Sequence, residues 1–325
     1  MVTLLKTLLW LLFLSVAVTT ALPFIPSNEW WIRGWDFPRL HIATLAAVCC
    51  LATLWLRPAG YLWVLVISLG VLVYQSAKII PYTSLYPTEL ALEPLHPDAE
   101  IFTVTSINVL KENEDRQQIA DYIRKEQPAV LLLMETDDTW RAALAEVLSL
   151  YKTVEYHPHK THYGMIFATN LVVEDFAFRL LSSDDTPTAV ALLVAPNGAR
   201  FSYIGLHPKP PIPGEDTDER DAQLLRAATI AHKRELPVIC IGDFNDVAWS
   251  RTSKHIKERG DFLDPRVGRG FYSSFDATHP LLRFPIDQLF VTKEVKMVSF
   301  GRGPHVGSDH FPMEATVYIE PALTQ

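Results

Sequence analysis

The sequence predicts an α/β domain preceded by three transmembrane helices, and three observations lead to this prediction. Residues 1–84 carry only five basic and two acidic side chains among long apolar stretches. The residues that follow carry 24 basic and 35 acidic side chains, a net charge of −11. In that second part, short apolar runs alternate with charged amphipathic segments, which is typical of an α/β domain with mixed sheets.

Composition limits the class of protein. Of 325 residues, 49% are apolar and 20% are charged, which excludes a disordered or collagen-like chain. The three cysteines are the adjacent Cys49 and Cys50 and the isolated Cys240, so a disulfide framework is excluded. The overall net charge of −8 argues against a basic nucleic-acid coat and identifies no partner.

Residues 1–84 predict a membrane anchor with three transmembrane helices. The apolar stretches are residues 4–22, 40–56 and 61–80. About 17 to 20 apolar residues suffice to cross a bilayer. The first loop holds three tryptophans, which favour the headgroup boundary: Trp30, Trp31 and Trp35. Residues 57–60 (Arg-Pro-Ala-Gly) predict a tight turn between the second and third stretches.

Two other interpretations of these stretches are open. The first stretch also fits a cleavable signal peptide, with Lys6 as its basic end and residues 19–21 as a weak cleavage site. The other alternative is that the stretches are buried helices of a soluble protein. The apolar character of all faces of these helices argues against it.

The positive-inside rule leaves the orientation of the anchor open. With the N-terminus inside, Lys6 and Arg57 lie on the inner side. Three basic residues then lie on the outer side: Arg33, Arg39 and Lys78. This count slightly opposes that orientation.

A proline-rich linker is predicted between the anchor and the soluble domain. Four prolines lie between Pro81 and Asp98, a composition typical of an extended spacer: Pro81, Pro87, Pro94 and Pro97. We therefore expect a linker over residues 85–99 and a soluble domain over residues 100–320.

The soluble domain predicts eight strands and three helices. The apolar or alternating runs typical of strands are residues 101–110, 129–134, 163–168, 189–194, 201–206, 237–241, 284–291 and 313–319. The segments with helical periodicity are residues 114–125, 136–150 and 217–234. Asp137 and Asp138 fall in the first turn of the second helix, where the helix dipole favours acids.

Polar side chains stand at the ends of the buried strands. Asn108 closes the first strand, Glu135 the second, and His207 follows residues 201–206. A carboxylate at such a position is poorly hydrated, so it needs a cation or a hydrogen-bond donor. Considered alone, Glu135 could instead cap the following helix, and His207 could have a purely structural role.

Two further motifs lie near the C-terminal half. Gly242-Asp243-Phe244-Asn245 follows an apolar strand, where Asp243 and Asn245 project to the same side if the chain stays extended. An ordinary Asx turn is the alternative. Asp287 begins another apolar strand, and Ser308-Asp309-His310 places an acid beside an imidazole just before the last strand.

In this order, the motifs resemble those of the endonuclease/exonuclease/phosphatase superfamily, in its membrane-anchored bacterial branch. The resemblance covers residues 100–320 and is carried by the collinear set Asn108, Glu135, His207, Gly242-Asp243-Phe244-Asn245, Asp287 and Ser308-Asp309-His310. It implies a DNase I-like four-layered α/β sandwich and a phosphoric ester hydrolase that depends on Mg²⁺ or Mn²⁺. From the family's usual arrangement, we expect the domain on the non-cytoplasmic side.

The resemblance also implies roles for these residues. Glu135 is expected to be the main metal ligand, with Asn108 and Asp309 near the metal. Asp243 would position or deprotonate the attacking water, and Asn245 would hold a phosphate oxygen. His310 would contact the scissile phosphate, and Asp287 would orient its ring. His207 would bind phosphate or take part in acid–base chemistry.

Other residues are weaker candidates. Lys209 and Arg283 lie next to these motifs and are candidates for binding substrate phosphates. The segment 157–162 holds three histidines and fits either a metal- or phosphate-binding loop or a solvated one.

The sequence leaves the substrate open. The expected partners are a phosphoester and a lipid bilayer, with no obligate protein partner. A nuclease needs a basic surface, which a domain of net charge −11 does not obviously supply. A lipid or small-molecule phosphodiesterase or phosphatase fits membrane tethering. A non-catalytic module that binds a phosphate ligand is a further alternative.

Overall fold

The computed structural model describes residues 1–94, 99–182 and 185–320. The chain forms two compact units. One comprises Met1–Pro87 with Pro211–Thr217, and the other comprises Thr88–Pro210 with Asp218–Gln325.

The first unit contains the three long apolar helices that the sequence predicts. They are α1 (Val2–Ala21), α3 (Arg39–Leu56) and α4 (Tyr61–Ile79), and the short helix α2 (Trp30–Arg33) lies between the first two. All three are long and apolar enough to cross a membrane, so they are candidate spans. Many of their large apolar side chains are exposed in the chain alone, as lipid-facing side chains are.

A buried polar network joins these three helices to one another. Gln75 of α4 donates to the Thr20 hydroxyl of α1 at 2.9 Å and accepts a hydrogen bond from the Arg39 guanidinium of α3 at 3.0 Å. Arg39 also pairs with Asp36, which precedes α3. Since polar groups inside an apolar bundle need partners, this network favours one specific packing of the helices.

The second unit is built on two sheets. A six-stranded sheet has the order β10 (Val295–Arg302), β11 (Met313–Ile319), β1 (Phe102–Asn108), β2 (Val130–Met134), β4 (Met165–Thr169) and β3 (Thr153–His157). A five-stranded sheet has the order β5 (Val172–Leu180), β6 (Pro187–Val194), β7 (Arg200–Leu206), β8 (Val238–Asp243) and β9 (Asp287–Val291).

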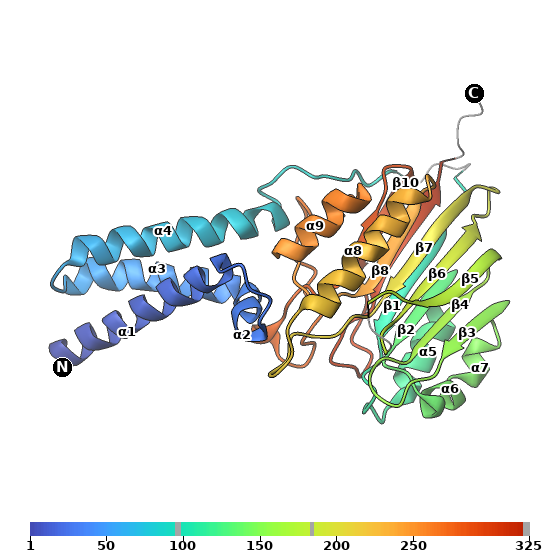
Figure 1. Cartoon of the computed structure of the whole chain (residues 1–325), viewed down its shortest axis with the longest axis horizontal. Helices are drawn as coiled ribbons and strands as arrows, with labels where there is room; N and C mark the ends of the chain where they lie inside the picture. The colour runs from blue at the N-terminus through green and yellow to red at the C-terminus, as the bar shows by residue number, and fades with distance from the viewer. Residues whose placement is uncertain (95–98, 183–184, 321–325) are drawn as a thin grey trace. The chain divides into compact units, whose positions relative to one another are not determined.

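The two sheets pack face to face, and helices cover their outer faces (Figure 1). Alternation along β2 shows why: Leu132 enters the core between the sheets, whereas Leu131 and Leu133 pack beneath helices. The helices on that side are α5 (Arg116–Glu126), α6 (Asp138–Ala143) and α7 (Ala145–Leu148). The other sheet is covered by α8 (Asp218–Lys233) and α9 (Arg251–Gly260). These four layers confirm the predicted α/β sandwich.

Several elements differ from the sequence prediction. The predicted helix over residues 136–150 is two short helices, α6 and α7, and Asp137 caps the first by accepting from the Trp140 N–H at 2.9 Å. In the second unit, the strands β3, β5 and β10 and the helix α9 were not predicted. The strands β3, β5 and β10 end their sheets, so they bury less of their surface and lack a continuous apolar run.

Part of the predicted linker lies along the second unit. Leu90 is buried in the core between the sheets, and the Glu93 N–H donates to the Met297 carbonyl at 2.7 Å. The Glu89 carboxylate pairs with Lys257 at 2.6 Å. Pro97 of the predicted linker lies outside the described residues.

The topology gathers particular loops at one end of the sandwich. Strands β1 and β2 are parallel, as are β7 and β8, so the carboxyl ends of each pair lie together. Strands β9 and β11 are antiparallel to β8 and β1, which brings their first residues to the same end. Every strand-end motif predicted from the sequence therefore lies at this end.

Candidate active site

The end of strand β8 requires a glycine at position 242. Gly242 has a φ of +147°, and a Cβ there would lie 2.0 Å from the Leu206 carbonyl oxygen. Only glycine permits both the conformation and the close approach. As a result, the end of β8 packs against the end of β7, and Asp243 comes next to His207.

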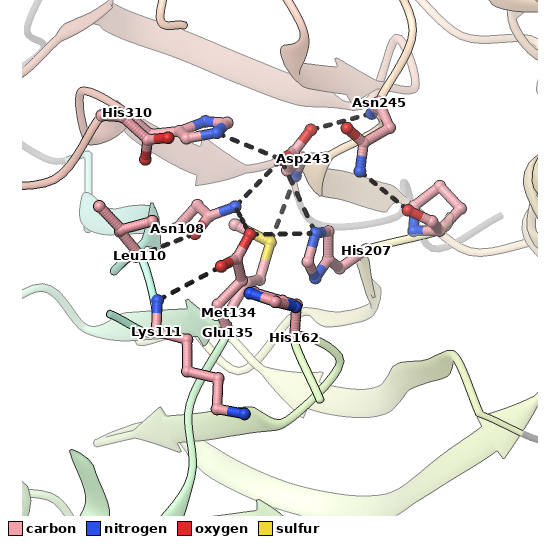
Figure 2. A network of polar contacts seen from close by, with 12 residues as sticks. Asn108, Leu110, Lys111, Met134, Glu135, His162, His207, Asp243, Asn245 and His310 are labelled. Carbon is pink, nitrogen blue, oxygen red and sulfur yellow. Dashed lines mark hydrogen bonds and ion pairs between the residues drawn. The ribbon is translucent and has the colours of Figure 1, made fainter. Parts of the chain in front are cut away.

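The Asp243 carboxylate is the centre of the site (Figure 2). Its Oδ2 accepts a hydrogen bond from the Asn108 side-chain amide at 3.2 Å. The same oxygen lies 3.8 Å from His207 Nε2 and 3.6 Å from His310 Nε2. Its Oδ1 accepts from the Asn245 main-chain N–H at 2.9 Å. Asp243 is 1% exposed, so these groups replace water around the carboxylate.

Glu135 lies beside this centre, just after β2. The Asn108 side-chain amide also donates to Glu135 Oε1, at 2.8 Å, and thereby joins the two carboxylates. Glu135 Oε2 accepts from the Lys111 main-chain N–H at 3.3 Å. The backbone φ of Glu135 is +63°, a conformation that costs a non-glycine residue about 1 kcal/mol or more. Such conformations cluster at functional sites, where the surrounding structure enforces them.

The Ser308-Asp309-His310 loop is fixed by the end of β1. The Ser308 hydroxyl donates to the Asn108 carbonyl at 2.7 Å and accepts from the His310 N–H at 3.1 Å. Across the site, His310 Nδ1 lies 2.7 Å from Asp287 Oδ2. Hydrogen bonds therefore hold both the main chain and the ring of His310.

Burial and neighbouring charges shift the pKa values of three site groups, His310, Asp309 and Asp287, and burial is the main cause of the raised pKa of Asp287. Burial alone would lower the pKa of His310, but the carboxylates of Asp287 and Asp243 outweigh it and raise that pKa to about 10. Burial raises the pKa of Asp309, and the nearby Glu135 and Asp243 carboxylates raise it further. Carboxylates crowded in this way favour a bound cation.

The donor set suits a hard divalent cation. Glu135, Asp243 and Asp309 offer carboxylate oxygens, which Mg²⁺ and Mn²⁺ prefer. The Asn108 amide oxygen accepts from the Leu110 N–H at 3.1 Å and keeps a second lone pair. The ligand atoms of Asp243, Asp287 and His310 also form a close cluster, but the raised pKa of His310 makes its ring a donor to the two carboxylates and not a metal ligand. The residues at this site therefore fit a divalent metal.

A second group of possible ligands is more exposed. His162 Nε2 lies 2.9 Å from the Glu112 carboxylate, and with Glu135 these residues form the other such cluster. His159 accepts from the Thr161 N–H at 3.2 Å within its own loop. Of the three histidines at 157–162, only His162 thus joins a cluster with Glu135.

The two predicted substrate-binding residues have different surroundings. Lys209 Nζ pairs with Glu219 at 2.7 Å and with Asp185 at 3.4 Å. Arg283 donates to main-chain carbonyls and lies over the Phe311 ring. The other predicted site residues lie together at the end of the sandwich described above.

Sequence reasoning missed Arg220 of α8. Its Nη1 donates to the Asn245 carbonyl at 2.9 Å and lies 3.5 Å from the Asp246 carboxylate. Asn245 has a φ of +49°, and its side-chain amide donates to the Pro208 carbonyl at 2.9 Å. Arg220 therefore fixes the turn that carries Asn245. In the sequence, the acidic Asp246 next to Asn245 indicates that a basic side chain is needed near this turn.

The family model of the endonuclease/exonuclease/phosphatase family matches residues 105–310, which include all of these site residues. The chain belongs to this family. Members of the endonuclease/exonuclease/phosphatase family are phosphoester hydrolases, which gives the general class of reaction. No curated protein matches the chain by sequence.

Solved structures share the endonuclease/exonuclease/phosphatase fold with this chain. The human Nocturnin catalytic domain with bound sulfate is 18% identical, with a TM-score of 0.55 over 68% of this chain and 96% of that domain. D. rerio TDP2 with a single-strand DNA product is 15% identical, with a TM-score of 0.54 over 67% and 98%. A Beutenbergia cavernae member of the family is 16% identical, with a TM-score of 0.54 over 68% and 72%. At these identities the likeness concerns the fold.

Proposed function

We propose that this chain is a membrane-bound, Mg²⁺- or Mn²⁺-dependent enzyme that hydrolyses phosphodiester bonds. The observation that carries the proposal is the position of Asp243, whose Oδ2 lies within 4 Å of two imidazoles and is joined through Asn108 to Glu135. This combination provides a base, two groups for the phosphate and ligands for a metal in one place.

Glu135 would be the main metal ligand, with Asn108 and Asp309 beside it. A divalent ion bound there would neutralise the charge that develops on the phosphoryl and leaving oxygens. The Asn108 amide links Glu135 to Asp243, so the metal ligands and the base keep a fixed geometry.

Asp243 would orient the attacking water and accept its proton. The carboxylate is held in a fixed position by the Asn108 amide and the Asn245 main-chain N–H, which is the arrangement that a general base needs. Asn245, two residues along the same turn, would donate its side-chain amide to a phosphate oxygen in place of the Pro208 carbonyl.

The two histidines would act on the phosphate. With its raised pKa, His310 is an imidazolium at neutral pH, and its Nε2 is therefore a charged donor directed into the site. Asp287 fixes the orientation of this ring. His207 would bind a second phosphate oxygen or supply a proton to the leaving oxygen.

The division of the chain supports action at a membrane. Residues 1–84 would serve as the anchor and residues 100–320 as the catalytic domain. Of the predicted linker over residues 85–99, the part from Thr88 on belongs to the same compact unit as that domain. The three candidate spans motivate a second candidate substrate, a lipid or small phosphoester, beside nucleic acid. The single-strand DNA product in D. rerio TDP2 motivates the nuclease alternative.

We infer that the catalytic domain lies on the non-cytoplasmic side of the membrane. A reporter enzyme that folds only outside the cytoplasm, fused after Gln325, is expected to be active. A cytoplasmic reporter at the same position is expected to be inactive, and the opposite pattern would reverse the orientation.

A substrate panel tests the catalytic proposal. The full chain in detergent would be incubated with bis-p-nitrophenyl phosphate, single- and double-stranded DNA, RNA, sphingomyelin and phosphoinositides, with Mg²⁺, Mn²⁺ or a chelator. We expect metal-dependent cleavage of at least one substrate. Tight binding of a phosphate ligand without cleavage of any substrate would instead support a binding module.

A further inference from the structure

Two arginines flank one aromatic ring beside the candidate active site. The Arg302 guanidinium carbon lies 3.9 Å from the centre of the Phe311 ring, and that of Arg283 lies 5.0 Å from it. Phe311 is buried and directly follows His310. Arg302 ends strand β10 and is exposed, and Arg283 is half-buried. Two positive charges thus meet on one small surface.

Neither arginine has an acidic partner within the described residues. Arg283 donates to the carbonyls of Asp276 and Ala277, at 3.2 and 2.8 Å. Arg302 donates to the Ser273 carbonyl at 2.7 Å. Burial and the charge of Arg283 lower the pKa of Arg302, as expected for uncompensated neighbouring cations. Each guanidinium has five N–H donors, so several remain available for a ligand.

Main-chain hydrogen bonds connect this surface to the catalytic loop. The Ala277 carbonyl accepts from Arg283, and the Ala277 N–H donates to the Asp309 carbonyl at 2.7 Å. On the other side, the N–H of Gly303, next to Arg302, donates to the Pro312 carbonyl at 2.8 Å. Both arginines are therefore attached to the segment that carries Asp309 and His310.

Lys209 differs from this pair in its electrostatic surroundings. Its ammonium group is paired with the carboxylates of Glu219 and Asp185. An anion approaching Lys209 would meet those two negative charges, whereas an anion approaching Arg302 would meet two unpaired positive charges. The structure thus favours the arginine surface as the anion-binding one.

We propose that Arg283 and Arg302 bind a second phosphate group of the substrate, next to the phosphate that is hydrolysed. The guanidinium fork matches phosphate geometry, and two forks on one ring suit a dianionic phosphate better than a neutral group. This inference rests on the proposed function and narrows it to substrates with two neighbouring phosphates. Nucleic-acid backbones and phosphorylated lipid headgroups share that chemistry.

Calorimetry on the full chain in detergent tests this inference without relying on turnover. One arm compares thymidine 3′,5′-bisphosphate with thymidine 5′-monophosphate. The other compares inositol 1,4-bisphosphate with inositol 1-phosphate. In one arm, we expect the bisphosphate to bind at least about tenfold more tightly, the effect of one additional charge-assisted hydrogen bond. The arm that shows the preference identifies a nucleotide or a headgroup as the source.

Substitution separates this surface from the remainder of the site. Arg302→Gln is expected to remove most of the preference for the bisphosphate. Arg200→Gln serves as the matched control, because Arg200 is exposed and begins β7, at the opposite end of that strand from His207. The inference is wrong if the wild-type chain binds both members of each pair equally, or if Arg302→Gln weakens both equally.

Turnover provides an independent readout. The p-nitrophenyl ester of thymidine 5′-phosphate would be compared with the same ester that carries a 3′-phosphate. If the nucleotide arm shows the preference, Arg302→Gln should bring the ratio of the two kcat/KM values close to one, mainly through KM. Absence of metal-dependent hydrolysis of every substrate would count against the proposed function, and the binding data would still decide the second phosphate site.

Discussion

His310 Nδ1 and Asp287 Oδ2 lie 2.7 Å apart, and both side chains are almost completely buried. The pair crosses from the loop before β11 of one sheet to the first residue of β9 in the other. Its charge state therefore affects both the chemistry of the site and the stability of the fold.

Asp287→Asn should destabilise the fold, and the loss of stability relative to wild type should become smaller as the pH rises. The folded-state pKa of His310 lies above its unfolded value of about 6.5, so the paired imidazolium stabilises the fold fully below that pH. This contribution is lost as the pH rises toward 10. Thermal unfolding with a chelator should show the difference in Tm between wild type and variant shrinking from pH 6 to pH 10. A constant difference would contradict the charged pair.

Asp243→Asn should abolish hydrolysis and leave the fold intact. The substitution preserves shape but removes the negative charge, so we expect activity to fall by about 10²- to 10⁴-fold, the usual contribution of a general base. Cooperative thermal unfolding with a chelator should show that the variant is still folded at the assay temperature. Asp175→Asn, at an exposed position on β5, is the control that should retain activity.

Glu135→Gln should weaken metal binding. Removal of the main carboxylate ligand is expected to lower Mn²⁺ affinity by at least about tenfold, measured by calorimetry on the full chain. Glu174→Gln, at an exposed position on β5, should leave the affinity unchanged. A larger loss in Glu112→Gln than in Glu135→Gln would instead assign the ion to the cluster with His162.

Arg220→Lys should lower kcat more than it raises KM. Lysine keeps the positive charge but cannot bind Asp221 through two N–H groups, as Nε and Nη2 do, while a third donates to the Asn245 carbonyl. Misplacement of a positioned group by 1 Å costs up to about 10²-fold in rate. Arg226→Lys, on an exposed position of the same helix, is the matched control. Equal rates in the two variants would show that Arg220 has only a structural role.

Gln75→Leu should destabilise the three-helix unit. It leaves the Thr20 hydroxyl and the Arg39 guanidinium each without one partner, at a cost of about 0.6–2 kcal/mol for interhelical hydrogen bonds. Thermal aggregation in detergent should begin at a lower temperature than in wild type. Thr44→Leu, on an exposed position of α3, should show no such shift.

Much of the candidate site could be predicted because its residues follow buried strands. Glu135 and Asp243 each end a run of apolar residues, and antiparallel pairing places Asp287 opposite Asp243. The contact between Arg220 and Asn245 could not be predicted, because it joins a helix to a turn 25 residues away through one side chain. Likewise, the strand that ends at Arg302 has mixed burial and no clear apolar run.

The hydrogen bond from Asn108 to Asp243 joins the carboxyl end of β1 to that of β8, and so crosses between the two sheets. Neither sheet alone contains a complete set of catalytic groups. A partly folded state that keeps its strands but separates the sheets would therefore be inactive. Enzyme activity therefore reports whether the two sheets are packed together. During refolding, activity should return when the sheets pack against each other, after secondary structure has formed.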